Sequence, residues 1–594
     1  MSFVGKREVV SVFCLLHRMR AKVVGLVSLG WALLLAAGLL VGCGDLGNSS
    51  PANGASSATS PVVATNGANS SAAPPAPTVS ATLSISRLRV TQLLSDTLVV
   101  AMSEDAISLD PARATGRTAA LIHKATYQTL VTWSGSPSDP PTRLLAESWE
   151  VSPDGLTYTF QLDARATFAS GNPVTGADVV FSFNRLRNGD GVPAALAANL
   201  AEVTTPDPAT VVLTLAAPDP DFLFKLAAAP FSVLDRATIL AQVGGTVDGQ
   251  ASQIAAWLNS HSAGSGPYQL ERWTPGIGAV LVRNEAYWRD SPALSRVVIR
   301  HVPYAAAQAL QLAAGDVDLA LDLRADQVEP VRNNPDVSIL TGVGQGTLLL
   351  AASTDPELAG PLADPAVVRA MRHGVDYAGI RQLVGTRSVP MVSILPVGHP
   401  DALGVDQAPI YDPELARNIL LEAGYQEPIS ATLSYPDVTL AGVPFGAVAR
   451  KVQSDLNTAG FRLSLSPQPV PAAFSAWYSG QVTLGLWYWR PAYGAPSAYL
   501  AFLPGGTMAR ALHWTDETAD ETILTIRDGL LQSTEGAARR EAWASAQRYL
   551  LEQGPYVPLV QPGVQIGLNS QVQGIRYHPQ WWVDVAAAAK PGPQ

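Results

Sequence analysis

The segment Leu144–Leu186 constrains the fold more than any other, because it specifies a turn, two strands and a helix in a fixed order. Pro153-Asp154-Gly155 is a turn signal between extended segments at Trp149–Val151 and Leu156–Leu162. The second segment alternates strictly and places four apolar side chains on one face: Leu156, Tyr158, Phe160 and Leu162. The pattern predicts a β-hairpin with one buried face.

A capped helix is expected directly after this hairpin. Gly171-Asn172-Pro173 breaks the chain, and Thr175 precedes Asp178 by three residues, the spacing of a capping box. Apolar residues then follow at helical spacing: Val179, Val180, Phe183 and Leu186. The polar residues of the whole segment form turns and caps, so local physics assigns it no chemistry.

The same residues resemble a known family. The run LAESWEVSPDGLTYTFQL, then F-x-x-G-x-P-V-T and A-D-V-V-F-S-F, is similar to the signature region of the oligopeptide, dipeptide and nickel-binding family (family 5) of ABC-transporter solute-binding proteins. Asp163-Ala164-Arg165 departs from the family pattern in a loop. The resemblance implies an α/β, two-lobed, periplasmic-binding-protein-like fold of type II, in the large class with an extra inserted domain.

The N-terminus has the features of a lipoprotein signal peptide. An apolar run, 23–41, follows five basic residues: Lys6, Arg7, Arg18, Arg20 and Lys22. Leu40-Val41-Gly42-Cys43 resembles a bacterial lipobox, which implies cleavage before Cys43 and lipidation of its thiol. An uncleaved membrane anchor is the alternative, since about 20 apolar residues can span a bilayer. Met19 is an alternative start. Both interpretations of the apolar run place the bulk of the chain outside the cytoplasm, attached to the cell membrane.

Composition limits what the exported part can do. The second cysteine, Cys14, lies in the segment to be removed, so no disulfide is expected. The net charge is −10 for the full chain, and loss of the five basic residues and Glu8 makes it −14, which argues against a nucleic-acid partner. Residues 47–86 carry no charge and are rich in Ser, Ala, Asn, Gly, Pro and Thr, which predicts a disordered tether reaching roughly 30–40 Å.

The resemblance covers about residues 97–585 and implies the order of domains. Gly264–Tyr268 resembles a marker at which the family's chain returns to its first lobe, and Gly554–Leu559 resembles a later returning strand. The expected segments are a signal peptide (1–43), the tether (44–96), lobe 1 (97–142), a hairpin-containing domain inserted in lobe 1 (143–262), the second part of lobe 1 (263–335), lobe 2 (336–555), and the return to lobe 1 with the C-terminal tail (556–594).

Local signals add elements independently of the resemblance. Asp-Pro pairs at 364–365 and 412–413 predict capped helix starts, the second with Leu415 and Ile419 facing inward. A further helix is expected around Val448–Leu456. Strands are expected at 98–102, 210–215, 297–302, 316–320 and 461–465, with a helix at 305–314 between the third and fourth.

The expected ligand segment departs from the family. Peptide binders of the family have G-W-x-A-D-Y-x-D-P, whose aspartate pairs with the ligand's α-amino group, and here Ala492 occupies that position. A buried ammonium without a counter-ion costs several kcal/mol, so this site should not hold a peptide amine in the usual way. The ligand-binding candidates are Trp487, Trp489, Arg490 and Tyr493, with Glu104 from the first lobe.

Two interpretations of these candidates remain open. In one, the aromatic rings stack on the solute and Arg490 binds a carboxylate, a phosphate or sugar hydroxyls. In the other, two of the three aromatic residues belong to the core and Arg490 lies on a domain surface. Trp581 and Trp582 have no assigned role.

An enzyme is not expected. The seven histidines of the exported part are scattered, with no zinc motif, and Gly264-Ser265-Gly266 lacks the nucleophile-elbow pattern. No catalytic residue, metal ligand or cofactor is therefore predicted, and no histidine cluster supports nickel or haem delivery. The expected protein is a monomeric extracytoplasmic receptor for a peptide or similar small solute, serving an ABC permease and ATPase. The alternative is a lipoprotein of the same fold that acts as a sensor or chaperone-like module without delivering solute.

Overall fold

The computed structural model describes residues 96–591 apart from 134, 136–138, 245–248, 386, 398, 441 and 533–535. The expected signal peptide, Cys43, the alternative start at Met19 and nearly all of the tether lie outside the described residues. The described chain is mixed α/β and contains three larger sheets.

The first sheet has seven strands in the order β12-β21-β11-β1-β10-β9-β8. Its central strand β1 pairs in parallel with both β10 and β11, and helix α9 connects these two, so the predicted α/β crossover is confirmed. The strands are β1 (Thr97–Met102), β8 (Tyr268–Thr274), β9 (Gly278–Arg283), β10 (Arg296–His301), β11 (Leu319–Ala320), β12 (Val337–Val343) and β21 (Gly563–Asn569). The helices α3 (Arg117–Thr126), α9 (Ala305–Ala314) and α10 (Ala325–Arg332) accompany them.

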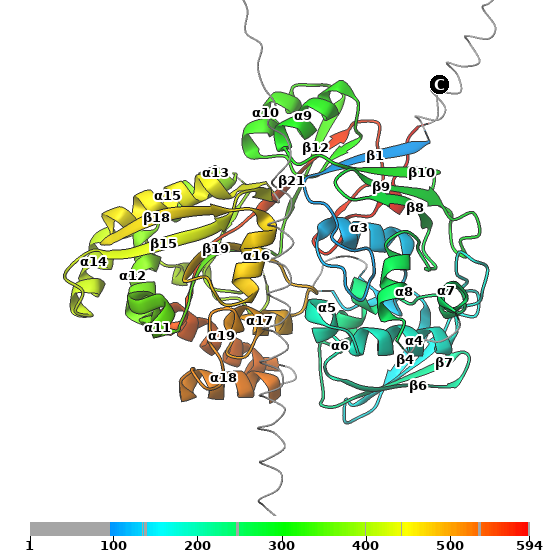
Figure 1. The fold of residues 1–594 in the computed structure, drawn as a ribbon, viewed down its shortest axis with the longest axis horizontal. Coiled ribbons are helices and arrows are strands. Elements are labelled where there is room, and N and C mark those ends of the chain that lie inside the picture. Colours follow the sequence, from blue (N-terminus) through cyan, green and yellow to red (C-terminus); the bar gives the residue numbers. More distant parts are fainter. Residues whose placement is uncertain are drawn as a thin grey trace, which may run out of the picture. The chain divides into compact units, whose positions relative to one another are not determined.

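The second sheet has six strands in the order β14-β20-β13-β19-β15-β18. These are β13 (Thr347–Ala352), β14 (Val389–Pro390), β15 (Ile429–Pro436), β18 (Phe461–Gln468), β19 (Leu484–Trp489) and β20 (Tyr556–Gln561). Figure 1 shows β15 and β18, in yellow, beside helices of the same part of the chain. The helices from this stretch are α11 (Pro356–Ala359), α12 (Pro365–Gly374), α13 (Tyr377–Val384), α14 (Pro413–Glu422), α15 (Phe445–Thr458) and α16 (Val470–Tyr478).

The predicted hairpin lies in a third sheet of four strands, ordered β4-β5-β7-β6. Strand β5 (Thr157–Leu162) pairs antiparallel with β4 (Ala146–Val151), and Tyr158, Phe160 and Leu162 are buried as the alternation predicted. The remaining strands are β6 (Leu200–Asp207) and β7 (Thr210–Leu215). Helices from this part of the chain are α4 (Gly176–Arg187), α5 (Gly191–Ala195), α6 (Phe222–Leu226), α7 (Arg236–Val243) and α8 (Ala251–Leu258).

Short pairs and helices complete the described fold. The two-stranded pairs are β2 (Val131–Thr132) with β3 (Thr142–Arg143), β16 (Thr439–Leu440) with β17 (Val443–Pro444), and β22 (Tyr577–His578) with β23 (Trp582–Val583). The late helices are α17 (Thr507–Arg510), α18 (Glu521–Gln532) and α19 (Gly536–Gln553). The 3-10 turns are η1 (Ala229–Phe231), η2 (Gly360–Ala363), η3 (Val405–Gln407), η4 (Pro496–Phe502) and η5 (Val585–Ala587).

The chain passes between the first and second sheets later than expected at both crossings. Strand β12, expected in lobe 2, pairs along its whole length with β21 of the first sheet. Strand β20, expected to begin the return to lobe 1, pairs with β13 and β14 of the second sheet. Backbone pairing decides membership here, because a short apolar strand fits either sheet. The crossings are therefore 344–346 and Pro562.

Most local predictions are confirmed, and one is wrong. Asp364 and Asp412 cap α12 and α14 by accepting backbone N–H groups of their first turns. Ile419 is buried as expected, but Leu415 is exposed. Helix α14 instead buries Ala416, Ile419 and Leu420, because its inward face is rotated by one residue from the predicted face.

Candidate ligand-binding cleft

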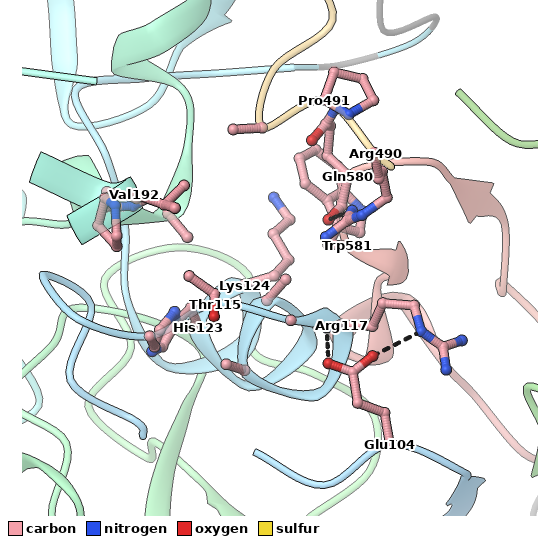
Figure 2. Close-up of a pocket in the computed structure, with 18 of the residues that line it drawn as sticks. Glu104, Thr115, Arg117, His123, Lys124, Val192, Arg490, Pro491, Gln580 and Trp581 are labelled. Carbon is pink, nitrogen blue, oxygen red and sulfur yellow. Dashed lines mark hydrogen bonds and ion pairs between the residues drawn. The ribbon is translucent and has the colours of Figure 1, made fainter. Parts of the chain in front are cut away.

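A cavity of about 1230 Å³ is lined by elements that belong to both large sheets. The loop after β1 and helix α3 contribute from the first sheet, and the end of β19 with helix α16 contributes from the second. The C-terminal segment adds Gln580 and Trp581. Figure 2 shows Lys124 on α3 extending toward the side of the cavity where Arg490, Pro491 and Trp581 lie.

Glu104 lines this cavity, and its carboxylate also holds helix α3 in place. One carboxylate oxygen accepts a hydrogen bond from the backbone N–H of Arg117 at 2.9 Å, and the other accepts one from the Nε–H of the same residue at 3.0 Å (Figure 2). The Arg117 guanidinium in turn donates to the buried Asp322 at 2.6 Å. Glu104 therefore satisfies an N-terminal amide of α3 and neutralises part of a buried cation.

Charge balance keeps this ion-pair network ionised. Burial acts to lower the pKa of Arg117, but the carboxylates of Asp322 and Glu104 outweigh it and raise that pKa. For Asp322, burial acts in the raising direction, and the Arg117 charge together with hydrogen bonds holds the pKa below its usual range. Arg117 and Asp322 are thus both charged at neutral pH and form a closely paired part of the cavity wall.

Trp581 and Trp582, for which no role was predicted, support the same wall. The Arg117 guanidinium carbon lies 4.5 Å from the ring centroid of the buried Trp582. The Lys124 ammonium lies 4.4 Å from the ring of Trp581, which stacks on His578 at 3.7 Å between centroids. Both arrangements are cation–π contacts, and they fix the C-terminal segment against α3.

His578 lies where the charges of Lys124 and Arg490 both act. Burial, together with the charges of Lys124 and Arg490, lowers its pKa to about 3. The two cations therefore act on one point although Lys124 comes from α3 and Arg490 from the segment after β19. A neutral His578 adds no charge of its own between them.

Three of the four candidates near β19 line the cavity. Trp487 packs on Trp477 with ring centroids 4.6 Å apart, and Trp489 packs on Phe502 at 4.7 Å, so each ring is held on one side while lining the cavity. Arg490 donates from Nη1 to the backbone carbonyls of Pro579 and Gln580 at 2.9 and 3.0 Å. Whether these side chains contact a solute stays a prediction.

Tyr493 lies apart from them, outside the residues that line the cavity. It is 5% exposed, its hydroxyl is 3.1 Å from the Ser497 hydroxyl, and Lys225 lies 5.6 Å from its ring. Ala492, at the family's aspartate position, does line the cavity and is exposed. A longer side chain at 492 therefore has access to the cavity.

Several cavity residues escaped sequence reasoning: Gly116, Arg117, Lys124, Phe474, Tyr478 and Trp581. Most carry no local motif, because they are brought together by three separate chain segments. Gly116 differs from the others, because its residue type is itself a signal. Its φ is +94°, and a Cβ atom there would lie 2.0 Å from Oε1 of Glu104. Only glycine fits that position without strain.

Two structural features are missing from the described part of the chain. No cluster of three or more His, Cys, Asp or Glu side chains suited to a metal ion is found within it. Among the same described residues, no helix combines the length and apolar character needed to cross a membrane.

The two large sheets, the two short crossings and the cavity between their elements define a two-lobed solute-binding fold. Solved structures share it: DppA from Helicobacter pylori in complex with peptide STSA (TM-score 0.71, 23% identity, 84% of this chain and 99% of that one) and a dipeptide-binding protein from Pseudoalteromonas sp. SM9913 with Met-Leu (TM-score 0.74, 20% identity, 83% and 100%).

Sequence comparison identifies the family. Residues 141–509 match the family described as bacterial extracellular solute-binding proteins, family 5 middle. Similar proteins include the probable D,D-dipeptide-binding periplasmic protein DdpA of Escherichia coli K12 (26% identity, 82% of this chain and 92% of that protein) and di/tripeptide-binding protein 2 of Pseudomonas aeruginosa UCBPP-PA14 (28%, 81% and 93%). The chain belongs to the family 5 solute-binding proteins, which are transport-associated binding proteins and not enzymes.

Proposed function

We propose that this protein is an extracytoplasmic, lipid-anchored receptor of an ABC importer that captures a peptide-like small solute in the cavity between its lobes. The observation that carries the proposal is the cavity of about 1230 Å³, lined by residues from both large sheets. Its volume exceeds the roughly 300–1,000 Å³ of typical small-molecule pockets, which suits a solute of several residues. The names of the two relatives, which refer to D,D-dipeptide and di/tripeptide binding, support the same solute class.

Capture proceeds by closure of the two lobes about the crossings. The crossings lie side by side, since Gly344 N–H donates to the Pro562 carbonyl at 3.3 Å and Gln561 Nε2 donates to the Gly344 carbonyl at 2.7 Å. Two short neighbouring segments concentrate a rotation into few residues, as a hinge requires. The closed receptor, a monomer, is then the form that the permease and its ATPase recognise.

The domain boundaries of this proposal follow the expected ones except at the crossings. Lobe 1 contains the inserted domain 143–262, and lobe 2 extends from about 347 to 561 because β12 and β20 set its limits. The proposed solute contacts are Trp487, Trp489, Arg490 and Glu104, which line the cavity. Tyr493 supports the same region from the core.

Small molecules that co-purify with the full-length protein test solute capture. We expect mass spectrometry to detect a defined solute, released on denaturation, and calorimetry to show that it rebinds at a single site. Absence of any bound solute, together with turnover of a compound at an enzymic rate, would contradict the proposal.

The lipid anchor is tested separately. We expect the N-terminal peptide of the mature protein to begin at Cys43 and to carry a lipid mass, and Cys43→Ala to remove both the lipid mass and the membrane association. A mature protein that retains residues 1–42 would instead indicate an uncleaved anchor.

A further inference from the structure

We propose that the solute is an organic acid with an apolar or aromatic body, held through its carboxylate by Arg490 and Lys124 and recognised independently of a free amino group. This inference rests on the proposed function and specifies the chemistry of the solute. It depends on how the charged side chains around the cavity are already paired.

Three of the four carboxylates that line the cavity are engaged within the described protein. Glu104 uses both oxygens on Arg117. Asp105 accepts the backbone N–H groups of Ala106 at 2.8 Å and Gly276 at 2.5 Å, and Asp584 accepts that of Ala586 at 3.0 Å. A ligand ammonium at any of these would have to compete with bonds that hold the fold.

The fourth carboxylate, Asp290, is exposed and lines the cavity. A solvated carboxylate contributes little to binding a cation, about 0–1 kcal/mol, because water screens the pair. The position at which family peptide binders carry an aspartate holds Ala492, which lines the cavity with a methyl group. No lining carboxylate is therefore both unengaged and shielded from water.

Two cations that line the cavity, Arg490 and Lys124, are paired less completely than the carboxylates. Arg490 has no carboxylate within salt-bridge distance among the described residues, and its Nη1 contacts are neutral carbonyl oxygens. Lys124 reaches its carboxylate partner Asp584 only at 3.9 Å and otherwise faces the Trp581 ring. A ligand carboxylate between these groups would complete the charge balance that the protein leaves open, and a guanidinium binds a carboxylate with two parallel hydrogen bonds.

Burial adds to the argument for Arg490. Burial lowers the pKa of this guanidinium, and the more distant charge of Glu104, which acts in the raising direction, offsets only part of that effect. The charges of Arg490 and Lys124 both act to lower the pKa of His578, so the two cations act on the same region of the cavity wall. An anion is the ligand group that relieves both effects.

An aromatic surface in the same part of the chain as Arg490 suits the body of such an acid. Phe474 and Tyr478 lie one helical turn apart on α16 with nearly parallel rings, 6.2 Å between centroids, and Phe474 contacts Trp487 at 5.8 Å. All three line the cavity, and the first two are 40% and 61% exposed. Exposed stacked rings in a cleft favour a planar or apolar ligand group.

The test uses four forms of one tripeptide made of leucine and phenylalanine: free or acetylated at the N-terminus, and acid or amide at the C-terminus. Calorimetry with the full-length protein in detergent should show that both acids bind, that amidation weakens binding tenfold or more, and that acetylation changes affinity less than threefold. Arg490→Gln and Lys124→Gln should each weaken binding of the acids at least fivefold and reduce the difference between acid and amide.

Arg332→Gln is the matched control, because Arg332 is an exposed arginine on α10 that pairs with Glu329 and does not line the cavity. It should bind all four peptides as the unmodified protein does. Ala492→Asp places a carboxylate at an exposed position that lines the cavity, so it should strengthen binding of the two free-amine forms by up to about fivefold, the limit for a solvated ion pair, and leave the acetylated forms unchanged.

Two results separate the possible failures. If acetylation abolishes binding while amidation has no effect, the cleft recognises an amine, and this inference is overturned while solute capture stands. If neither the unmodified protein nor Ala492→Asp binds any of the four peptides and no solute co-purifies, the proposed function itself fails.

Discussion

At the scale of single residues, the wall of the cleft depends on groups that satisfy one another in a chain. Gly116 leaves room for the Glu104 carboxylate, Glu104 binds Arg117, and Arg117 lies on Trp582 and pairs with Asp322. The carboxylates satisfy the charge and the backbone amide of Arg117, so a change at one end of this chain of contacts should weaken the other contacts.

Gly116→Ala tests this chain. We expect it to lower the free energy of unfolding by about 2–3 kcal/mol, since the new Cβ atom would both require a left-handed backbone and displace the Glu104 carboxylate. Gly171→Ala is the control: Gly171 has a similar φ of +90° but no atom within 4 Å of the added Cβ, so about 1 kcal/mol is expected. If chemical denaturation shows the same loss of free energy of unfolding for both variants, the Glu104 carboxylate moves aside without destabilising the fold.

His123 predicts a pH dependence of stability. Burial lowers its pKa from 6.5 to about 4, and its Nε2 lies 3.0 Å from the Leu109 carbonyl. The unfolded chain therefore binds the proton first, so stability from this group is present above pH 6.5 and is lost as the pH falls toward 4, by about 3 kcal/mol. Between pH 7 and 4.5, the free energy of unfolding should fall less steeply with pH in His123→Gln than in the unmodified protein. His261→Gln is the control with an exposed histidine.

At the scale of elements, the segment after the hairpin shows how a local signal and a tertiary contact share one residue. The Asp178 carboxylate accepts from the backbone N–H and the hydroxyl of Thr175 at 2.9 and 2.6 Å, which closes the capping box of α4. Its other oxygen accepts the backbone N–H of Arg236 at 3.1 Å, which joins α4 to α7. The first contact follows from the sequence spacing, and the second depends on the fold.

Thr175→Ala and Asp178→Ala should therefore differ. Removal of the threonine hydroxyl weakens one cap, and we expect a loss of about 1 kcal/mol in the free energy of unfolding. Removal of the carboxylate also leaves the Arg236 amide without this partner, so a loss of about 2–3 kcal/mol is expected. Equal effects in urea denaturation would mean that the contact to α7 contributes nothing.

At the scale of the whole molecule, the inserted domain contacts elements that lie between β19 and β20 of the second sheet. Asp221, next to α6, accepts from Arg539 of α19 at 2.7 Å and from the Ser497 backbone N–H at 3.1 Å. The carboxylate and the guanidinium are 7% and 12% exposed, and one apolar cluster extends across the same junction. This junction connects the inserted domain to the part of the chain proposed as lobe 2.

Arg539→Gln should loosen this junction. A buried carboxylate left without its cation costs about 3 kcal/mol, and we expect that loss of stability together with an increased radius of gyration in small-angle X-ray scattering of the ligand-free protein. Arg548→Gln is the control on the same helix, since its pair with Glu541 is exposed and should change stability by less than about 1 kcal/mol. An unchanged radius would indicate that the ion pair stabilises the fold without influencing lobe position.

The sequence alone determined the features that depend on neighbours along the chain. We could predict the 144–186 hairpin and helix and the aspartate caps of α12 and α14, because turn formation, capping and alternation act over a few residues. The alanine at position 492 is read directly from the sequence. Three of the four candidates near β19 also proved to line the cavity.

The tertiary structure decided what depends on distant partners. Packing against segments far along the chain decides which sheets β12 and β20 join. It also leaves Leu415 exposed and places Tyr493 in the core. The link of Glu104 to Arg117 and Asp322 and the position of Lys124 beside Trp581 likewise join separate segments. Such contacts have no spacing in the sequence, because pairing, burial and charge compensation are settled only when the distant segments meet.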